Sequence, residues 1–263
     1  MPKFFRRDKC LGLGIIQKKH RLSCIIMAVV SLWKRNKLVT KLLKLFIPAK
    51  FLPHAIKIQI FLYRRKVALF KPLNRHLDLH FWKKRAFDVP APTLVKWAFL
   101  QKFGKCDVWI ETGTFTGDTT NFLARNSNFV YSIEPEMNLA ELAKKRFKKD
   151  LKIEIIHGTS ENEFEKVLSK LNGEVSIWLD GHYSAGNTFK GEQETPIRQE
   201  LNTIEKLLDR FKNINIFIDD FRCFDPENSE FREYPSKQFL VNWAEKCNLK
   251  WTVQHDIFYA FKP

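Results

Sequence analysis

The chain has 263 residues, of which 44% are hydrophobic and 14% aromatic. This apolar content is enough for a packed core and excludes a chain that is disordered throughout. The net charge of +16 is unevenly distributed, because residues 1–90 hold 22 Lys and Arg against three Asp, whereas residues 91–263 have a slight acidic excess.

The basic N-terminal third contains an apolar run that is too short to cross a membrane. Residues 22–33 fall well below the roughly 20 residues that a transmembrane helix needs. The run ends in Trp-Lys-Arg-Asn-Lys rather than in the small residues of a signal-peptide cleavage site. The five cysteines are scattered, without zinc-ligand spacing, which favours free thiols. We therefore expect a cytoplasmic protein, with an uncleaved membrane anchor as the minor alternative.

A basic amphipathic helix is predicted from residue 34 onward. Helical spacing separates two sets of side chains, with Lys34, Lys37, Lys41 and Lys44 on one face and Leu38, Leu42, Leu45 and Phe46 on another. Such a helix either packs on the rest of the protein or lies on an anionic membrane surface. Peripheral contact at the inner membrane face through residues 1–66 is therefore one expectation. Nucleic-acid binding is less favoured, because the basic clusters at 64–66 and 83–85 come without an RNA-binding motif.

A domain boundary is predicted at Pro90-Ala-Pro92, because two prolines this close break any helix. Residues 1–90 are expected to form a basic, helical N-terminal extension. Residues 91–263 are expected to form a separate, nearly neutral domain.

In this second part, short apolar runs alternate with helical patterns, which is typical of a parallel sheet in an α/β fold. Strands are expected at 107–111, 129–134, 152–156, 175–180 and 214–219. Helices are expected at roughly 117–126, 137–149, 161–171, 194–211 and 236–246. Two further apolar runs, 249–254 and 257–261, are too closely spaced for a parallel crossover and must be antiparallel neighbours.

A glycine-containing turn, Glu111-Thr-Gly-Thr-Phe-Thr-Gly117, follows the first predicted strand. Its spacing is not G-x-G-x-x-G, and no Gly-Lys-Ser/Thr follows, which disfavours a dinucleotide site or a P-loop. The turn resembles motif I of class I S-adenosylmethionine-dependent methyltransferases. The resemblance implies a Rossmann-like fold with a mostly parallel seven-stranded sheet and an antiparallel C-terminal hairpin strand. It also implies that Glu111 holds the ammonium group of the cofactor, with Gly113, Thr114 and Gly117 beside the ligand.

The ends of the next two strands supply further candidates for binding the cofactor. Glu134 follows the second strand, where a carboxylate can accept both ribose hydroxyls, as it would for a nicotinamide dinucleotide. Ser160 follows the third strand, in a segment that resembles the adenine-lining part of the methyltransferases. Ser160 and Glu163 are alternatively a helix capping box.

Three carboxylates, Asp180, Asp219 and Asp220, follow the fourth and fifth strands. An all-oxygen set of this kind suits Mg²⁺ better than zinc. The layout resembles the metal-dependent O-methyltransferases of the catechol type, with Asp in place of the Asn that is common as the third ligand. The alternative is a metal-free site in which Asp180 contacts the cofactor.

His182 lies two residues beyond the fourth strand, where a side chain that titrates near neutral pH can take a proton from the acceptor. Asp180 and His182 are therefore the candidate catalytic residues. The loop 183–196 is expected to close over the acceptor, with Glu192, Glu194 and Arg198 as candidate contacts.

Residues from about 90 onward also resemble an uncharacterised group of bacterial-type methyltransferase-like proteins that share Glu-Thr-Gly-Thr, Leu-Asp-Gly-His-Tyr-Ser and Ile-Asp-Asp-x-Arg elements. The resemblance implies O-methyl transfer from S-adenosylmethionine to a small-molecule or glycan hydroxyl, with Mg²⁺ as an optional aid. Two alternatives stay open: a Rossmann-type nucleotide-dependent oxidoreductase, and a non-catalytic, membrane-tethered adaptor with the same fold.

Overall fold

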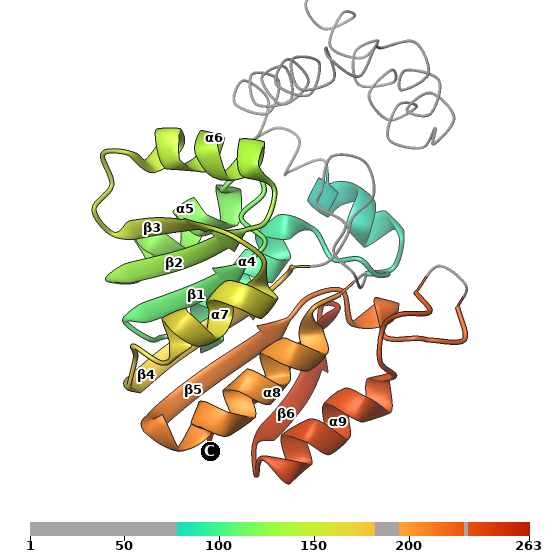
Figure 1. Ribbon diagram of the computed structural model, residues 1–263. Helices are drawn as coiled ribbons and strands as arrows, with labels where there is room; N and C mark the ends of the chain where they lie inside the picture. The colour runs from blue at the N-terminus through green and yellow to red at the C-terminus, as the bar shows by residue number, and fades with distance from the viewer. Residues whose placement is uncertain (1–77, 182–194, 229–230) are drawn as a thin grey trace, which may run out of the picture. The chain divides into compact units, whose positions relative to one another are not determined.

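The computed structural model describes residues 78–181, 195–228 and 231–263, which we call the described domain (Figure 1). The chain divides into two compact units, Met1–Gln59 and Ile60–Pro263, and every described residue belongs to the second. The predictions for residues 1–66 and for the loop residues His182, Glu192 and Glu194 lie outside the described residues. No helix of the described domain is both long enough and apolar enough to span a bilayer.

The described domain is built on a seven-stranded sheet with the order β3-β2-β1-β4-β5-β7-β6. The strands are β1 (Val108–Thr112), β2 (Phe129–Glu134), β3 (Ile153–His157), β4 (Gly173–Leu179), β5 (Phe211–Ile218), β6 (Lys250–Gln254) and β7 (Ile257–Phe261). Strands β1 to β5 pair in parallel, and β7 pairs antiparallel with both β5 and β6. The prediction of a mostly parallel sheet with an antiparallel C-terminal strand is confirmed.

The order of the strands reverses at β1, since β2 follows it on one side and β4 on the other. In open parallel sheets a ligand crevice forms beyond the carboxyl ends of the strands at such a point. The predicted site residues lie at or just after the ends of β1 to β5, so the topology places them along this one edge.

Helices cover both faces of the sheet (Figure 1). They are α4 (Thr93–Phe103), α5 (Asp118–Arg125), α6 (Met137–Phe147), α7 (Ser160–Leu168), α8 (Ile197–Leu207) and α9 (Lys237–Lys246), with 3-10 turns at Leu208–Arg210 and Phe221–Cys223. Helices α4 and α5 pack with Trp109 and Phe217 on one face. Helices α7, α8 and α9 pack with Ile110 and Ile177 on the other. The two buried faces explain why the central strands are apolar along their length.

Helix α4 was not among the predicted elements. Its sequence, Thr-Leu-Val-Lys-Trp-Ala-Phe-Leu-Gln-Lys-Phe, mixes apolar and basic residues around the helix and so lacks a clear amphipathic pattern. Tertiary packing holds it instead: Trp97, Phe99 and Leu100 are buried, and Trp97 stacks on Phe122 at 4.8 Å between ring centroids. Burying one large aromatic side chain is worth roughly 2 to 3 kcal/mol.

The residues that precede α4 also contact the sheet. Residues 78–84 are helical, and Trp82 is buried with its ring 5.9 Å from that of His255, in the turn between β6 and β7. The indole nitrogen of Trp82 donates a hydrogen bond to the carbonyl of Asp88 at 2.8 Å. The separation of an extension and a domain at residue 90 stays a prediction.

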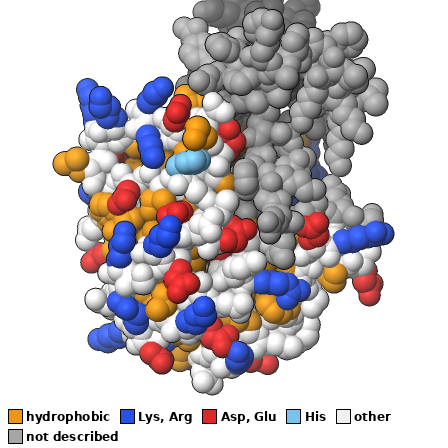
Figure 2. Space-filling view, viewed as in Figure 1, with side chains coloured by type: hydrophobic (Ala, Val, Ile, Leu, Met, Phe, Trp, Pro, Cys, Tyr) orange, Lys and Arg blue, Asp and Glu red, His pale blue; other side chains and the backbone are white. Residues whose placement is uncertain are grey.

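The surface of the described domain carries both signs of charge. In Figure 2 Lys and Arg side chains alternate with Asp and Glu over the face that α7 and α8 cover. This mixture agrees with the small net charge that the sequence assigns to residues 91–263. On this face there is no uniformly basic surface of the kind that nucleic-acid binding favours.

Candidate functional site

Two groups of acidic side chains lie at the carboxyl edge of the sheet. Glu111 and Glu134, from the ends of β1 and β2, form the first group, in which the charge of Glu134 acts on Glu111. Asp180, Asp219 and Asp220, from the ends of β4 and β5, form the second, with ligand atoms within 4.8 Å of one another. The structure therefore brings together the acids that the sequence singled out, in two separate sets.

The glycine turn between β1 and α5 is shaped by close packing against the protein itself. Gly113 has φ +89°, and a methyl group placed on it would lie 2.5 Å from the carbonyl oxygen of Asp180. Gly117 has φ +73°, and a methyl group there would lie 2.6 Å from the ring of Phe147. Both positions need glycine for the backbone conformation and for space. The turn thus joins the end of β1 to the end of β4 and to helix α6.

Glu111 is buried with one carboxylate oxygen occupied and the other unpartnered. Its Oε2 accepts hydrogen bonds from Thr120 Oγ1 at 2.5 Å and from Ser132 Oγ at 2.6 Å, and Thr114 Oγ1 lies 2.6 Å from Ser132 Oγ. Its Oε1 has no hydrogen-bond partner among the described residues. Burial raises the pKa of Glu111 to about 7. A buried acceptor without a donor is costly, so this atom is suited to a ligand donor such as an ammonium group.

Glu134 is held by two backbone amides. Phe115 N donates to Oε2 at 2.7 Å, and Glu136 N donates to Oε1 at 3.0 Å. Burial raises the pKa of Glu134 to about 7, and these two hydrogen bonds oppose the shift. Each oxygen keeps a further lone pair for a ligand hydroxyl, since a carboxylate offers about four acceptor positions. The carboxylate is thus oriented by the glycine turn, through Phe115, rather than by other side chains.

Ser160 begins helix α7, but the capping box predicted for it is wrong. The N-cap residue is Thr159, and no side chain caps the helix. Glu163 instead pairs with Lys166 at 2.8 Å. Ser160 is buried, and its hydroxyl group lies close enough to Glu200, from helix α8, to affect the pKa of that acid.

Glu200 is a buried acid that the sequence interpretation missed. Burial raises the pKa of Glu200 to about 7, and hydrogen bonding to Ser160 opposes the shift. The hydroxyl of Thr112 also opposes this rise in the pKa of Glu200. Neither Thr112 Oγ1 nor Glu200 Oε1 has a hydrogen-bond partner among the described residues. A methyl group placed on Gly181 would lie 3.1 Å from Thr112 Oγ1 and 3.7 Å from Glu200 Oε1. Unsatisfied polar atoms therefore line both faces of the sheet where its order reverses.

A signal for Glu200 is present in the sequence. Helix α8 buries Ile197, Leu201 and Ile204 in the core, and Glu200 shares this apolar stripe. An ionisable residue at a core position of an amphipathic helix is unusual unless it is paired or functional.

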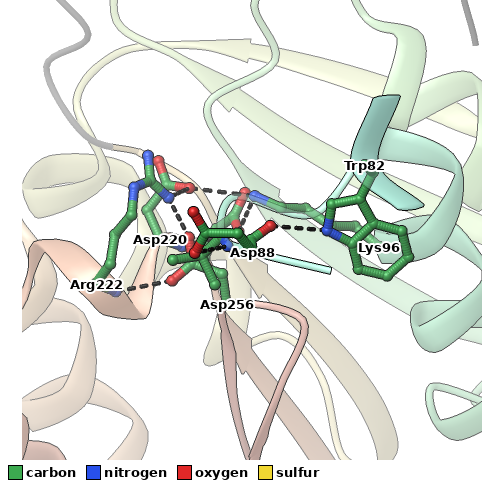
Figure 3. A network of polar contacts seen from close by, with 8 residues as sticks. Trp82, Asp88, Lys96, Asp220, Arg222 and Asp256 are labelled. Atoms are coloured by element: carbon green, nitrogen blue, oxygen red, sulfur yellow. Dashed lines mark hydrogen bonds and ion pairs between the residues drawn. The ribbon is translucent and has the colours of Figure 1, made fainter. Parts of the chain in front are cut away.

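A lysine side chain contacts two members of the aspartate group. The ammonium nitrogen of Lys96, from helix α4, lies 2.5 Å from Asp219 Oδ1 and 3.1 Å from Asp220 Oδ1 (Figure 3). Burial alone would lower the pKa of Lys96, but the charges of Asp219, Asp220 and Asp180 outweigh it and raise that pKa. Burial raises the pKa of Asp219 to about 6, and the ammonium group opposes the shift. Two of the three carboxylates therefore have the ammonium group of Lys96 at hydrogen-bonding distance.

A second cation completes the network. Arg222 Nη1 lies 2.7 Å from Asp220 Oδ1 and also pairs with Asp256, from the turn between β6 and β7. Figure 3 shows Lys96 and Arg222 on opposite sides of the acidic groups. The sequence interpretation noted Arg222 only as part of a motif and did not consider Lys96 or Asp256. Arg198, a predicted acceptor contact, lies with its guanidinium group 4.6 Å from the ring centroid of Phe239.

Comparisons with known proteins give structural matches only. No protein-family model matches the chain, and no curated protein matches it. A SAM-dependent methyltransferase of Aquifex aeolicus shares 14% identity at a TM-score of 0.40, over 62% of this chain and 86% of that one. An rRNA methylase of Streptococcus thermophilus shares 16% identity at 0.40, over 66% and 96%. The SMU.1697c protein of Streptococcus mutans, solved in complex with SAH, shares 12% identity at 0.42, over 66% and 98%.

The fold assignment rests on the strand order and on the antiparallel β7 rather than on these matches. The structure adds the strand order β3-β2-β1-β4-β5-β7-β6 to the prediction of a mostly parallel sheet with an antiparallel C-terminal pair. The described domain therefore has a Rossmann-like α/β fold with an antiparallel β7 between β5 and β6.

Proposed function

We propose that this chain is an S-adenosylmethionine-dependent methyltransferase that transfers a methyl group to a hydroxyl oxygen of a small-molecule or glycan acceptor. The observation that carries the proposal is the unpartnered, buried Oε1 of Glu111. It lies at the end of β1 in a class I fold, beside a second buried carboxylate that two backbone amides hold at the end of β2.

The residues present fit the cofactor by their chemistry. Glu111 would accept a hydrogen bond from the ammonium group, Glu134 would accept those of the ribose hydroxyls, and the turn from Gly113 to Gly117, with Thr114, would line the ligand. Ser160 is proposed at the adenine side. When bound, S-adenosylmethionine supplies an electrophilic methyl group on a positively charged sulfur. Buried carboxylates attract a cationic ligand and so make its binding more favourable.

The proposed contribution of the protein to methyl transfer is alignment and proton removal. Aligning the acceptor with the methyl group supplies much of the rate enhancement in reactions of this kind. His182 and Asp180 are proposed to take the acceptor proton. Glu200 is a further candidate, because its pKa of about 7 lies near the pH at which a general base works best.

Mg²⁺ does not fit the aspartate group in its present arrangement. The carboxylate oxygens suit the ion, but the ammonium group of Lys96 already contacts Asp219 and Asp220. The proposed reaction therefore contains no metal-dependent step.

The class of acceptor is proposed from the rest of the chain. A basic segment at residues 1–66 that contacts the anionic inner face of the membrane would place a cytoplasmic enzyme beside glycan or lipid-linked acceptors. RNA, the acceptor in the name of the Streptococcus thermophilus protein, is less favoured here because residues 91–263 have a slight acidic excess.

Calorimetric titration of the purified full-length chain tests the donor site. S-adenosylhomocysteine should bind and NAD should not, and Glu111→Gln should weaken binding while Glu141→Gln, on the exposed face of α6, should not. Stronger binding of NAD would favour an oxidoreductase instead. Incubation with labelled S-adenosylmethionine and a cell extract, followed by mass spectrometry, tests for transfer and identifies the acceptor; a chain that binds the cofactor without any transfer would favour an adaptor.

A further inference from the structure

The three aspartates at the ends of β4 and β5 form a site that needs a cation. Their ligand atoms lie within 4.8 Å of one another, and Asp219 is buried. Like charges at this separation repel each other, and burial adds a desolvation cost, unless a positive charge lies among them. Sites lined only by carboxylate oxygens commonly bind a divalent metal ion.

Lys96 provides this positive charge from within the chain. Its ammonium nitrogen lies at hydrogen-bonding distance from both Asp219 and Asp220, and the charge of Asp180 also acts on it. The lysine side chain is only 12% exposed. An ion pair this well buried is not the mobile, solvated contact of a surface lysine.

The position of Lys96 is fixed by the helix that carries it. In α4 the adjacent Trp97 stacks on Phe122 and donates a hydrogen bond from Nε1 to Thr119 Oγ1 at 3.2 Å. Phe99 packs edge-on against Phe217, whose side chain lies on β5 just before the two aspartates. Helix α4, which the sequence did not predict, is therefore anchored to α5 and to β5 by residues that closely follow Lys96, and it holds the ammonium group at the end of β5.

An ammonium group and a divalent ion cannot share this position. Mg²⁺ requires carboxylate oxygens at roughly 2.0 to 2.1 Å in octahedral geometry, whereas Lys96 already lies 2.5 Å and 3.1 Å from two of the three carboxylates. Bringing the ion in would place two cations side by side, so the lysine would have to leave. Arg222 Nη1 lies 2.7 Å from Asp220 Oδ1, so Asp220 keeps a cationic contact when Lys96 is replaced.

We propose that Lys96 is a built-in substitute for a divalent metal ion. Its ammonium group holds Asp180, Asp219 and Asp220 together, makes the site independent of divalent cations, and excludes them. Removing the ammonium group converts the three aspartates into a divalent-cation site. The part of the proposal that concerns metal binding does not depend on the proposed methyl transfer, whereas independence of the reaction from metal rests on it.

Binding of Mn²⁺, followed by electron paramagnetic resonance on the full-length chain, tests the proposal. Wild-type protein should show no saturable submillimolar site. Lys96→Met, which keeps the volume of the side-chain stem, should gain one site. Lys96→Arg should retain the exclusion, and Lys102→Ala, an exposed lysine on the same helix, should match the wild type. Mn²⁺ or Mg²⁺ should also raise the melting temperature of Lys96→Met but not that of the wild type.

Two results would overturn the proposal. One is saturable Mn²⁺ binding by the wild type that Asp219→Asn abolishes, since the lysine would then not exclude the ion. The other is a folded Lys96→Met that still binds no Mn²⁺. If Lys96→Met does not fold, the Mn²⁺ titrations of the wild type and of Lys96→Arg still test whether a cationic side chain excludes the ion. Where methyl transfer is detected, EDTA should leave the wild-type rate unchanged; where none is detected, the methyltransferase proposal fails while the Mn²⁺ result stands.

Discussion

The ammonium nitrogen of Lys96 lies 2.5 Å from Asp219 Oδ1, and this contact joins helix α4 to the end of strand β5. The two residues are 123 positions apart in the chain. Because both side chains are largely buried, the pair links the position of α4 to the charge state of the site.

Removing one partner of the pair should cost more stability than removing both. Lys96→Met leaves Asp219 buried without its counter-charge, a change that typically costs about 3 to 5 kcal/mol. In the double variant Lys96→Met/Asp219→Asn no uncompensated charge remains at Asp219, so part of the loss should be recovered. Urea unfolding of the wild type, both single variants and the double variant measures the coupling. Additive losses in that cycle would show that the contact contributes little.

Glu200 should make the free energy of unfolding fall as pH rises. Its pKa is raised from 4.5 to about 7 in the folded protein, so the folded state binds the proton more tightly than the unfolded state. The stabilisation is complete below the unfolded value and is lost between about pH 4.5 and pH 7, with a limit on the order of 3 kcal/mol. Glu200→Gln should flatten the profile in this window. Glu165→Gln, at an exposed position of α7, should reproduce the wild-type slope; an unchanged slope in Glu200→Gln would contradict the assignment.

Binding of S-adenosylhomocysteine near pH 7 should release protons. Burial raises the pKa of both Glu111 and Glu134 to about 7, and an ammonium group placed beside Glu111 would favour its ionised form. Calorimetry in buffers with different ionisation enthalpies measures the number of protons. Glu111→Gln should reduce the release and weaken binding roughly ten- to hundredfold, as expected for loss of a charged hydrogen bond. Equal proton release in both proteins would rule Glu111 out as the source.

Gly113 and Gly173 both have a left-handed backbone, and comparing them distinguishes backbone strain from steric conflict. Gly113 has φ +89° and Gly173 has φ +79°, but a methyl group on Gly113 meets the Asp180 carbonyl at 2.5 Å, whereas one on Gly173 meets nothing within 4 Å. Gly173→Ala should therefore cost about 1 to 2 kcal/mol, the strain of a left-handed alanine. Gly113→Ala should cost clearly more and abolish cofactor binding. Denaturant unfolding and calorimetry check both, and equal losses of stability would show that space at Gly113 is not limiting.

Features that depend on a local sequence pattern, such as the strands and the acids that follow them, were predicted correctly from the sequence. Apolar runs bounded by turn residues located the strands, and the short spacing between the last two runs gave the antiparallel hairpin. The acids that follow strands were found for the same reason, because parallel topology places strand ends at one edge. Glu111, Glu134, Asp180, Asp219 and Asp220 thus lie at the predicted edge.

The sequence could not predict contacts that tertiary packing creates. Helix α4 lacks an amphipathic pattern, so Lys96 gave no sign of reaching the end of β5, and a metal ion was the natural choice for three converging carboxylates. Ser160 and Glu163 had the spacing of a capping box, but Thr159 is the N-cap residue and a buried acid from another helix lies near the serine instead. In each case a partner distant in the sequence outweighed the local signal.

The turn at His255 and Asp256 has a consequence for the order in which the chain folds during synthesis. Asp256 forms an ion pair with Arg222, and the ring of His255 packs against that of Trp82. The last hairpin of the sheet therefore contacts a residue that is synthesised near the start of the domain. A ribosome-bound chain that lacks residue 256 could form β1 to β4 with their helices, but its polar network would stay incomplete. The contacts of Asp256 and His255 can therefore form only after these two residues have been synthesised, whereas the residues of the glycine turn are synthesised earlier.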